Sequence, residues 1–207
     1  MRIYDFKGFP NPTRVRIALA EKNLTDRVEF VSVDVPAGEH KRPEFLAKNP
    51  SGAVPVLELE DGTTIAECTA ITEYLDNLEG EPTLTGKSAK ERAVIHMMQR
   101  RAEAGLFDAV ATYFHHATPG LGPHIETYQN PEWGEKNRER AVAGMSYLDR
   151  LLAKQPFLAG ERFSMADITA FVGLAYADFA MIAVPGELSN LRAWRVRVAD
   201  RPGVANA

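Results

Sequence analysis

Residues 49–57 read NPSGAVPVL, an apolar strand pattern with a proline, Pro55, near its start. Proline has no N–H group to donate, so it is excluded from an ordinary position in the middle of a sheet. One interpretation is an edge strand that begins at the proline. The other is a cis Val54–Pro55 bond, which turns the backbone N–H and C=O of Val54 out of the sheet toward an extended peptide ligand. This stretch alone leaves both interpretations open.

A hairpin and a helix follow this stretch. The strand patterns Val54–Leu59 and Thr63–Ala66 flank Asp61-Gly62, a dipeptide that favours a tight turn. Residues 67–78 then read as a helix, whose first N–H groups and positive dipole end suit a carboxylate ligand. In the simpler interpretation, Glu67 is only a favourable charge in the first turn and Cys68 is a small packing residue.

The residues before this stretch predict a strand, a helix and a second strand at Arg2–Phe6, Thr13–Asn23 and Val28–Val33. These three elements form a βαβ unit. Together with the hairpin and the helix they give a mixed sheet rather than the regular alternation of a doubly wound fold. We therefore expect an α+β N-terminal domain over residues 1–80.

A polar stretch rich in Gly and Pro begins at Glu79, and strand patterns almost vanish after it. We place a linker at residues 81–88 and an all-helical domain at residues 89–207. Apolar residues recur at helical spacing in this second domain over residues 89–113, 135–153, 166–180 and 188–200.

The composition excludes several classes of function. The chain has 207 residues, of which 45% are hydrophobic and 25% charged, and a formal net charge of -4. This charge opposes a nucleic-acid partner, which requires clustered Lys and Arg. The most apolar stretch, residues 168–184, is interrupted by Asp178, so no membrane partner is expected. The single cysteine, Cys68, excludes an internal disulfide and fits a cytoplasmic protein.

Taken together, NPSGAVPVL, the hairpin and ECTAITEYL at residues 67–75 resemble the glutathione site of the cytosolic glutathione transferases. The resemblance implies a thioredoxin-like N-terminal domain in which the main chain of Val54, before Pro55, pairs with the cysteinyl backbone of glutathione. It also implies that Glu67 and residue 68 hold the γ-glutamyl end. The family usually has Ser at this position, and because the thiol of Cys68 is a weaker donor, we expect somewhat weaker binding.

Two further motifs extend the resemblance. GEHK at residues 38–41 matches the family segment that contacts the glycyl carboxylate, which makes His40 and Lys41 candidates. Without that match, a His-Lys pair in a loop is usually just solvated. FSMADI at residues 163–168 matches the family's helix-capping motif, with Ser164 and Asp167 in the capping roles. With NLRAW at residues 190–194, the resemblance covers nearly the whole chain.

Conjugation requires a thiolate, and a free thiol with a pKa of about 8.5 is mostly protonated at neutral pH. Family classes with a catalytic Ser or Cys carry it where this chain has Phe9, which cannot donate. The stretch GFPNPTRV, residues 8–15, is most similar to the Thr-Pro-Asn-Gly pattern of the nu class and its fungal relatives, and implies a bacterial family member. It makes Asn11 the expected thiolate donor, with Tyr4 second. We also expect Asn11 to be the helix N-cap and Pro12 the first helical residue.

The electrophile is expected between the domains, with Phe9, Tyr113 and His116 as walls, although aromatic residues at helix ends are more often part of a core. The neighbouring His115 suggests a metal pair, but no third ligand stands at a suitable spacing, so we expect no metal.

We therefore expect a glutathione transferase that joins glutathione, its co-substrate, to small hydrophobic electrophiles or reduces organic peroxides with it. The alternative is a non-catalytic glutathione-binding or regulatory protein with the same fold. The resemblance also implies a homodimer.

Overall fold

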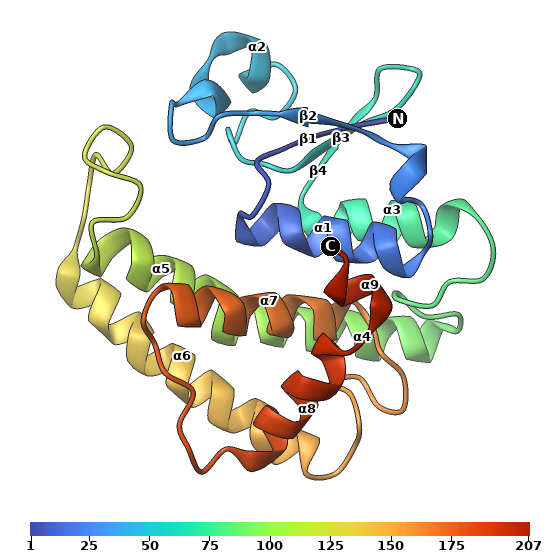
Figure 1. Cartoon of the computed structure of the whole chain (residues 1–207), viewed down its shortest axis with the longest axis vertical. Helices are drawn as coiled ribbons and strands as arrows, with labels where there is room; N and C mark the ends of the chain where they lie inside the picture. Colours follow the sequence, from blue (N-terminus) through green and yellow to red (C-terminus); the bar gives the residue numbers. More distant parts are fainter. The chain divides into compact units, whose positions relative to one another are not determined.

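The computed structural model describes all residues from Met1 to Ala207. The chain divides into two compact units (Figure 1). Unit 1 comprises Met1–Leu84 together with Pro202–Ala207, and unit 2 comprises Thr85–Arg201. The linker expected at residues 81–88 stays a prediction.

A four-stranded mixed sheet organises unit 1. Its strands are β1 (Arg2–Asp5), β2 (Glu29–Ser32), β3 (Val56–Glu58) and β4 (Thr64–Ala66), in the order β2-β1-β3-β4. The β1–β2 pair is parallel and the other two pairs are antiparallel. The expected thioredoxin-like domain is therefore confirmed.

The strand at residues 49–57 is not at an edge. β3 lies between β1 and β4, with Leu57 opposite Ile3 on one side and Ile65 on the other. Pro55 precedes the first paired residue of β3, and the Val54–Pro55 bond is cis. The edge-strand interpretation was wrong, because pairing begins only at Val56, after the residue that lacks an N–H.

The turn between β3 and β4 has the chemistry that its dipeptide predicts. The carboxylate of Asp61 accepts the backbone N–H of Thr63 at 2.9 Å, and Gly62 has a φ of 85°. A positive φ is costly for a residue with a Cβ and costs little for glycine. The turn therefore fixes the register of the hairpin that leads into the next helix.

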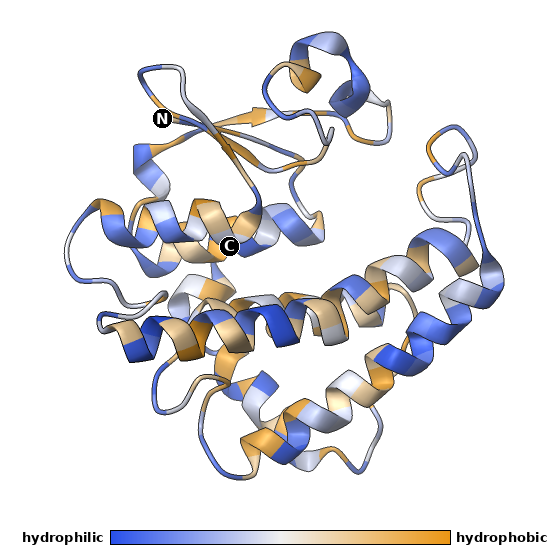
Figure 2. Cartoon of the chain, turned by 180° about the vertical axis from the view of Figure 1, so that it is seen from behind, coloured by the Kyte–Doolittle hydropathy of each residue, from blue (hydrophilic) through white to orange (hydrophobic).

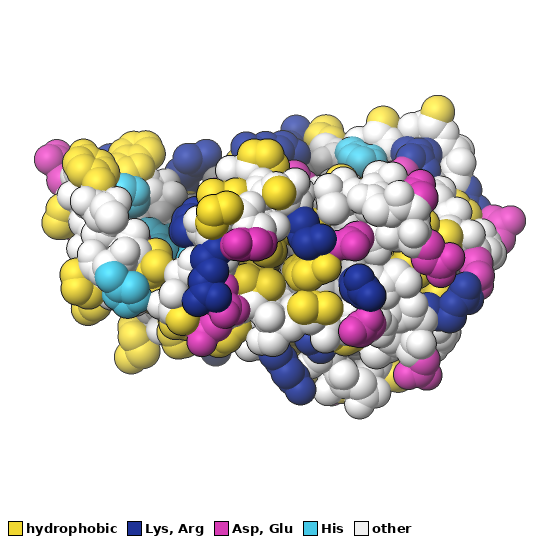
Figure 3. All heavy atoms as spheres, turned by 90° about the horizontal axis from the view of Figure 1, so that it is seen from above, with side chains coloured by type: hydrophobic (Ala, Val, Ile, Leu, Met, Phe, Trp, Pro, Cys, Tyr) yellow, Lys and Arg dark blue, Asp and Glu magenta, His cyan; other side chains and the backbone are white.

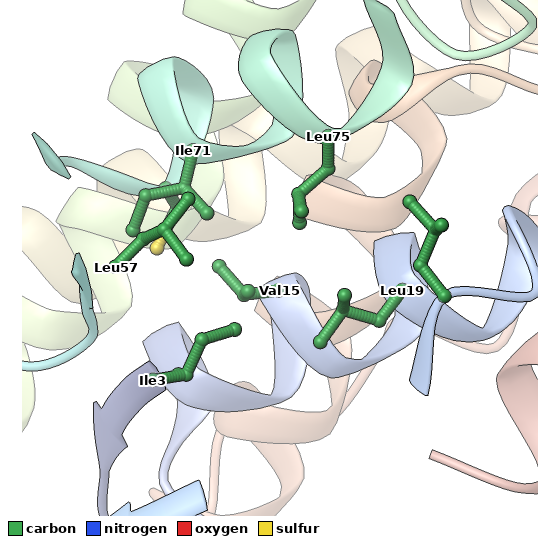
Figure 4. Packing of buried hydrophobic residues seen from close by; sticks show 8 residues of the cluster. Ile3, Val15, Leu19, Leu57, Ile71 and Leu75 are labelled. Carbon is green, nitrogen blue, oxygen red and sulfur yellow. The ribbon is translucent and has the colours of Figure 1, made fainter. Parts of the chain in front are cut away.

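The core of unit 1 lies between the sheet and helices α1 (Pro10–Glu21) and α3 (Cys68–Leu78). Figure 4 shows side chains from both helices pointing toward side chains from β1 and β3. The unit is completed by η1 (Thr25–Arg27), η2 (Glu39–Lys41), α2 (Pro43–Leu46) and α9 (Pro202–Ala205), which packs on α1. The fully buried residues at the centre of this core are Ile3, Val15, Leu19, Leu57, Ile71 and Leu75.

Unit 2 consists of helices, which confirms the expected all-helical domain. They are α4 (Ala89–Ala102), α5 (Asp108–Ala117), α6 (Pro131–Leu152), α7 (Met165–Phe179) and α8 (Ser189–Ala199). Figure 2 shows hydrophilic and hydrophobic residues in turn along these helices, as expected for helices with one face in a core. Trp194 of α8 is fully buried there.

A π-helical turn, η3 (Glu103–Phe107), joins α4 to α5 where the sequence predicts one uninterrupted helix. Two glycines on other helices lie against this turn. A Cβ built on Gly144 of α6 would lie 2.2 Å from the carbonyl oxygen of Gly105, and one built on Gly173 of α7 would lie 3.2 Å from Leu106. Because these glycines have no side chain, α6 and α7 can pack directly against the π-helical turn.

The close approach at Gly144 predicts a cost for any larger residue. Gly144→Ala forces α6 away from the Gly105 carbonyl, and overpacking of this kind costs about 1–3 kcal/mol. Urea denaturation measures the loss. Gly186→Ala is the control, because no atom lies within 4 Å of its added Cβ. Equal stability of the two variants would show that the α6 contact is not tight.

Candidate functional site

Helix α1 begins earlier than the sequence suggests. Its N-cap is Phe9, with extended backbone angles, and Pro10 is the first helical residue. The N–H of Thr13 donates to the carbonyl of Phe9 at 3.0 Å, which closes the first turn there. The expectation that Asn11 is the N-cap and Pro12 the first helical residue was therefore wrong. Proline fits both positions, because the first-turn N–H groups lack a helical partner in any case.

The side chain of Asn11 is held by its oxygen. The guanidinium of Arg14, one helical turn later, donates to Oδ1 at 3.0 Å, and the thiol of Cys68 approaches the same atom at 3.5 Å. The amide nitrogen, Nδ2, makes no hydrogen bond within the protein. Asn11 is half-buried, so its two N–H groups are available to a ligand.

Glu67 and Cys68 lie where β4 passes directly into α3. Ala66 ends the strand and Cys68 begins the helix, so Glu67 alone turns the chain. It does so with φ 69° and ψ 122°, a combination that is rarely populated by any residue except glycine. Strain of this kind is found mainly at ligand sites. Glu67 is exposed, and its carboxylate makes no hydrogen bond or ion pair with another side chain.

The side chain of Cys68 faces α1 rather than solvent. It is 6% exposed, and its sulfur lies 3.4 Å from the carbonyl oxygen of Asn11. The thiol therefore does not take the place of the usual serine hydroxyl as a donor to a ligand. It connects the first turns of α1 and α3.

The backbone of Val54 is free of partners within the protein. Neither its N–H nor its C=O makes a hydrogen bond in the chain, because pairing of β3 starts at Val56. The side chain packs against Val33, Phe45 and Val56. This arrangement leaves one donor and one acceptor for an extended ligand, which requires both.

Residues 38–41 lie beside the loop that leads to Val54. The ammonium of Lys41 donates to the carbonyl of Gly52 at 3.1 Å, and a Cβ on Gly52 would lie 3.0 Å from the carbonyl oxygen of His40. His40 is 5% exposed, and its Nδ1 atom is buried without a hydrogen-bond partner. Burial, with a smaller contribution from Lys41, lowers the pKa of His40, so the ring is uncharged at neutral pH.

Phe9 and Tyr4, two further residues of unit 1 that the sequence suggests, have packing roles. The ring of Phe9 stacks edge-on against Phe6, with ring centroids 4.7 Å apart. Tyr4 packs in β1 beside Val56, and the ammonium of Lys48 lies 4.7 Å from its ring centroid. Asn11 is therefore the better candidate donor.

Tyr113 and His116 both lie on α5 of unit 2. His116 accepts the backbone N–H of Asn130, the N-cap of α6, at 3.1 Å through Nδ1, so it helps to fix the connection between the two helices. Tyr113 is half-buried, and its hydroxyl makes no hydrogen bond within the protein. A joint electrophile pocket with Phe9 stays a prediction.

The structure offers no metal site and no membrane-spanning helix. No three His, Cys, Asp or Glu side chains lie close enough together to hold a metal ion. None of the helices has the length and apolar character needed to cross a bilayer. On the face drawn in Figure 3, basic and acidic side chains are interspersed rather than gathered into a patch of one sign.

Comparison with known proteins shows the family of the chain. Residues 10–78 match the family model "Glutathione S-transferase, N-terminal domain", and residues 131–197 match "Glutathione S-transferase, C-terminal domain". The chain belongs to the glutathione S-transferase family. The two family domains correspond to the mixed sheet with its helices and to the helical unit.

Individual members of the transferase family are similar over almost the whole chain. Glutathione S-transferase 2 of Saccharomyces cerevisiae is 59% identical over 204 residues, which are 99% of this chain and 88% of the relative. The crystal structure of Gtt2 from the same yeast has a TM-score of 0.98, with 100% and 99% of the two chains covered. A transferase domain-containing protein of Marinobacter aquaeolei is 61% identical, with a TM-score of 0.97 and coverage of 99% and 100%.

Arg14 is the residue of the candidate site that the sequence reasoning missed. The available signal was its spacing, since residues three apart on a helix lie on the same face. A buried arginine so close to a candidate amide indicates that the amide is oriented by its neighbours.

Proposed function

We propose that Asn11 stabilises the thiolate of bound glutathione by donating a hydrogen bond from Nδ2. The protein is a glutathione transferase, with glutathione as its co-substrate. The observation that carries the proposal is the orientation of the Asn11 side-chain amide. Its oxygen is occupied by Arg14 and Cys68, while its nitrogen has no partner in the protein.

The rest of the glutathione molecule would lie along the residues of unit 1 described above. The free N–H and C=O of Val54, next to Pro55, would pair with the cysteinyl backbone. The exposed carboxylate of Glu67 would bind the γ-glutamyl ammonium, and the N-terminus of α3 at Cys68 would bind its carboxylate. His40 and Lys41 would contact the glycyl carboxylate.

The electrophile would meet the thiolate beside Phe9, Tyr113 and His116. Half-buried aromatic side chains favour small hydrophobic electrophiles, and the free hydroxyl of Tyr113 offers them one hydrogen bond. Organic peroxides are the other substrate class we propose.

We further propose a homodimer in the cytoplasm without a metal, and a light-scattering mass near the 22.9 kDa of one chain would contradict the dimer. We also propose, from residues 8–15, that the protein is related to the nu class and has a bacterial source.

The first experiment is a pH titration of the protein with and without glutathione, followed by the ultraviolet absorbance of the thiolate. The expected result is a bound thiol whose pKa lies well below the value of about 8.5 for a free thiol. Binding with an unshifted pKa would contradict the role of Asn11 and favour the non-catalytic alternative. Failure to bind would contradict the whole site.

His40 provides a separate test of the glycyl end. Loss of one hydrogen bond to a carboxylate costs about 1.5 kcal/mol, so His40→Ala weakens glutathione binding roughly tenfold while the pKa of the bound thiol stays unchanged. A bound anion favours the protonated ring, so affinity in the wild type rises as pH falls toward the lowered pKa of His40. Calorimetric titration measures both effects. His124→Ala, on the exposed loop before α6, is the control, and equal affinities for the two variants would remove His40 from the site.

A further inference from the structure

The first observation concerns the two groups that approach the oxygen of Asn11. A guanidinium has only N–H donors, so the contact from Arg14 at 3.0 Å requires an acceptor at that position. The sulfur of Cys68 lies 3.5 Å from the same atom and 3.4 Å from the backbone carbonyl oxygen of Asn11, and its single S–H donates to one of the two at a time. The guanidinium, with the thiol beside it, places the amide oxygen on this side, and the NH₂ group points away from them.

The second observation is that both groups are themselves fixed. Arg14 is 4% exposed on α1, and Cys68 is 6% exposed at the start of α3. Cys68 belongs to the core cluster that includes Val15 and Ile71. Because the cluster joins α1 and α3, it fixes the distance between Asn11 and its second donor.

We infer that Arg14 and Cys68 are positioning residues that hold the Asn11 amide with its N–H groups toward the glutathione sulfur. Both act through Asn11 and would not contact the reacting thiol. An unrestrained asparagine can present its oxygen or its nitrogen, and an oxygen facing a thiolate is repulsive. The inference rests on the proposed role of Asn11. It assigns Cys68 an orienting role in place of the ligand-binding hydroxyl that serine would supply.

The principal test compares two arginines of the same helix. Arg14→Met removes the guanidinium from Asn11 and retains most of the apolar stem. The expected result is a rise of about one unit in the pKa of the bound glutathione thiol and a roughly tenfold lower kcat/KM below that pKa. The dissociation constant of glutathione stays unchanged when it is measured at a pH where the bound thiol is protonated. Arg16→Met is the matched control, because Arg16 bonds to Asp5 at 2.7 Å and stacks on Phe30 without contacting Asn11.

Cys68 gives a second, milder test, which remains informative if Arg14→Met does not fold. Cys68→Ala removes the thiol donor and is expected to raise the thiol pKa by a few tenths of a unit. Cys68→Ser restores a stronger donor of similar size and is expected to recover the pKa that the alanine variant loses. Equal pKa values in the alanine and serine variants would overturn the role of Cys68.

A double-mutant cycle separates this inference from the proposed function. If Arg14 acts through Asn11, Arg14→Met has no further effect on the thiol pKa in a protein that already carries Asn11→Ala. Additive effects would show that Arg14 acts directly, and the positioning role would be wrong. If Asn11→Ala alone leaves the pKa unchanged, the proposed function itself fails, which is a different result.

Discussion

Asn11→Ala is expected to raise the pKa of the bound glutathione thiol by about one to two units and to lower kcat/KM roughly ten- to hundredfold near neutral pH. A hydrogen bond to a charged group contributes about 1.5–3 kcal/mol, and one pKa unit corresponds to about 1.4 kcal/mol. The substitution also removes the oxygen that accepts from the buried guanidinium of Arg14, so some loss of stability accompanies the loss of activation. The thiol pKa is therefore measured on folded protein, because it reports activation separately from stability.

Two companion variants show whether the donor itself is responsible. Asn11→Asp keeps the shape and an acceptor for Arg14 but replaces the NH₂ group with a negative oxygen, so the thiol pKa rises further than in the alanine variant. Asn77→Ala removes an exposed amide of α3 that bonds within its own helix and leaves the thiol pKa at the wild-type value. If Asn11→Asp retains a low thiol pKa, another group activates glutathione.

Asp167→Ala is expected to have the largest effect on stability. The carboxylate of Asp167 is fully buried, and it accepts the N–H groups of Leu158 at 2.9 Å, Ser164 at 3.0 Å and the Trp194 indole at 3.0 Å. These donors come from the loop after α6, the start of α7 and α8. Each buried donor without an acceptor costs about 1–3 kcal/mol, so we expect a loss of roughly 4 kcal/mol or more. That is a large share of the roughly 5–15 kcal/mol typical of a domain.

Urea denaturation of three variants tests this role. Asp178→Ala, on the same helix, removes an exposed carboxylate paired with Arg195 and is expected to cost no more than about 1 kcal/mol. Ser164→Ala removes the hydroxyl but keeps the other contacts of the capping box, which the structure confirms, and is expected to cost about 1 kcal/mol. A mild effect of Asp167→Ala would mean that water replaces the lost acceptor.

Asp167 also predicts a pH dependence of stability. Burial outweighs the hydrogen bonds to its carboxylate and raises its pKa from 3.8 to about 6. The native state therefore binds the proton more tightly than the unfolded state, and this stabilisation is lost as pH rises between these values. Asp167→Asn does not titrate in this range and serves as the reference. The free energy of unfolding of the wild type should fall by about 3 kcal/mol relative to that variant as the pH rises across the range. If the difference in free energy of unfolding between the two proteins stays constant with pH, the carboxylate is not destabilised by burial.

The elements of the fold could be predicted from local patterns. Asp61-Gly62 marked the hairpin, and the strand patterns around it gave β3 and β4 to within two residues at each end. The capping box at Ser164 and Asp167 was predicted because its two residues are close in sequence. The π-helical turn was not predicted, because the groups that accommodate it, Gly144 and Gly173, lie on other helices.

The candidate site was predicted in part. Val54, His40, Lys41 and Glu67 were selected by motif, and the structure brings His40 and Lys41 beside the loop that leads to Val54. The helix start was placed wrongly, because the stretch 10–12 has a proline at either end and either can begin a helix. Only the backbone of Phe9, held by Thr13, decides between them.

The sequence by itself determined the order of strands and helices, the family resemblance and the identity of Asn11 as a candidate donor, since each depends on residues close together in the chain. Only the tertiary structure decided that β3 is an inner strand and that the sulfur of Cys68 faces Asn11 across 57 residues of chain. The direction of the Asn11 amide was decided in the same way. An asparagine amide has an oxygen that accepts and a nitrogen that donates hydrogen bonds. The packing of α1 and α3 places donors against the oxygen, and the nitrogen is therefore the atom that faces a ligand.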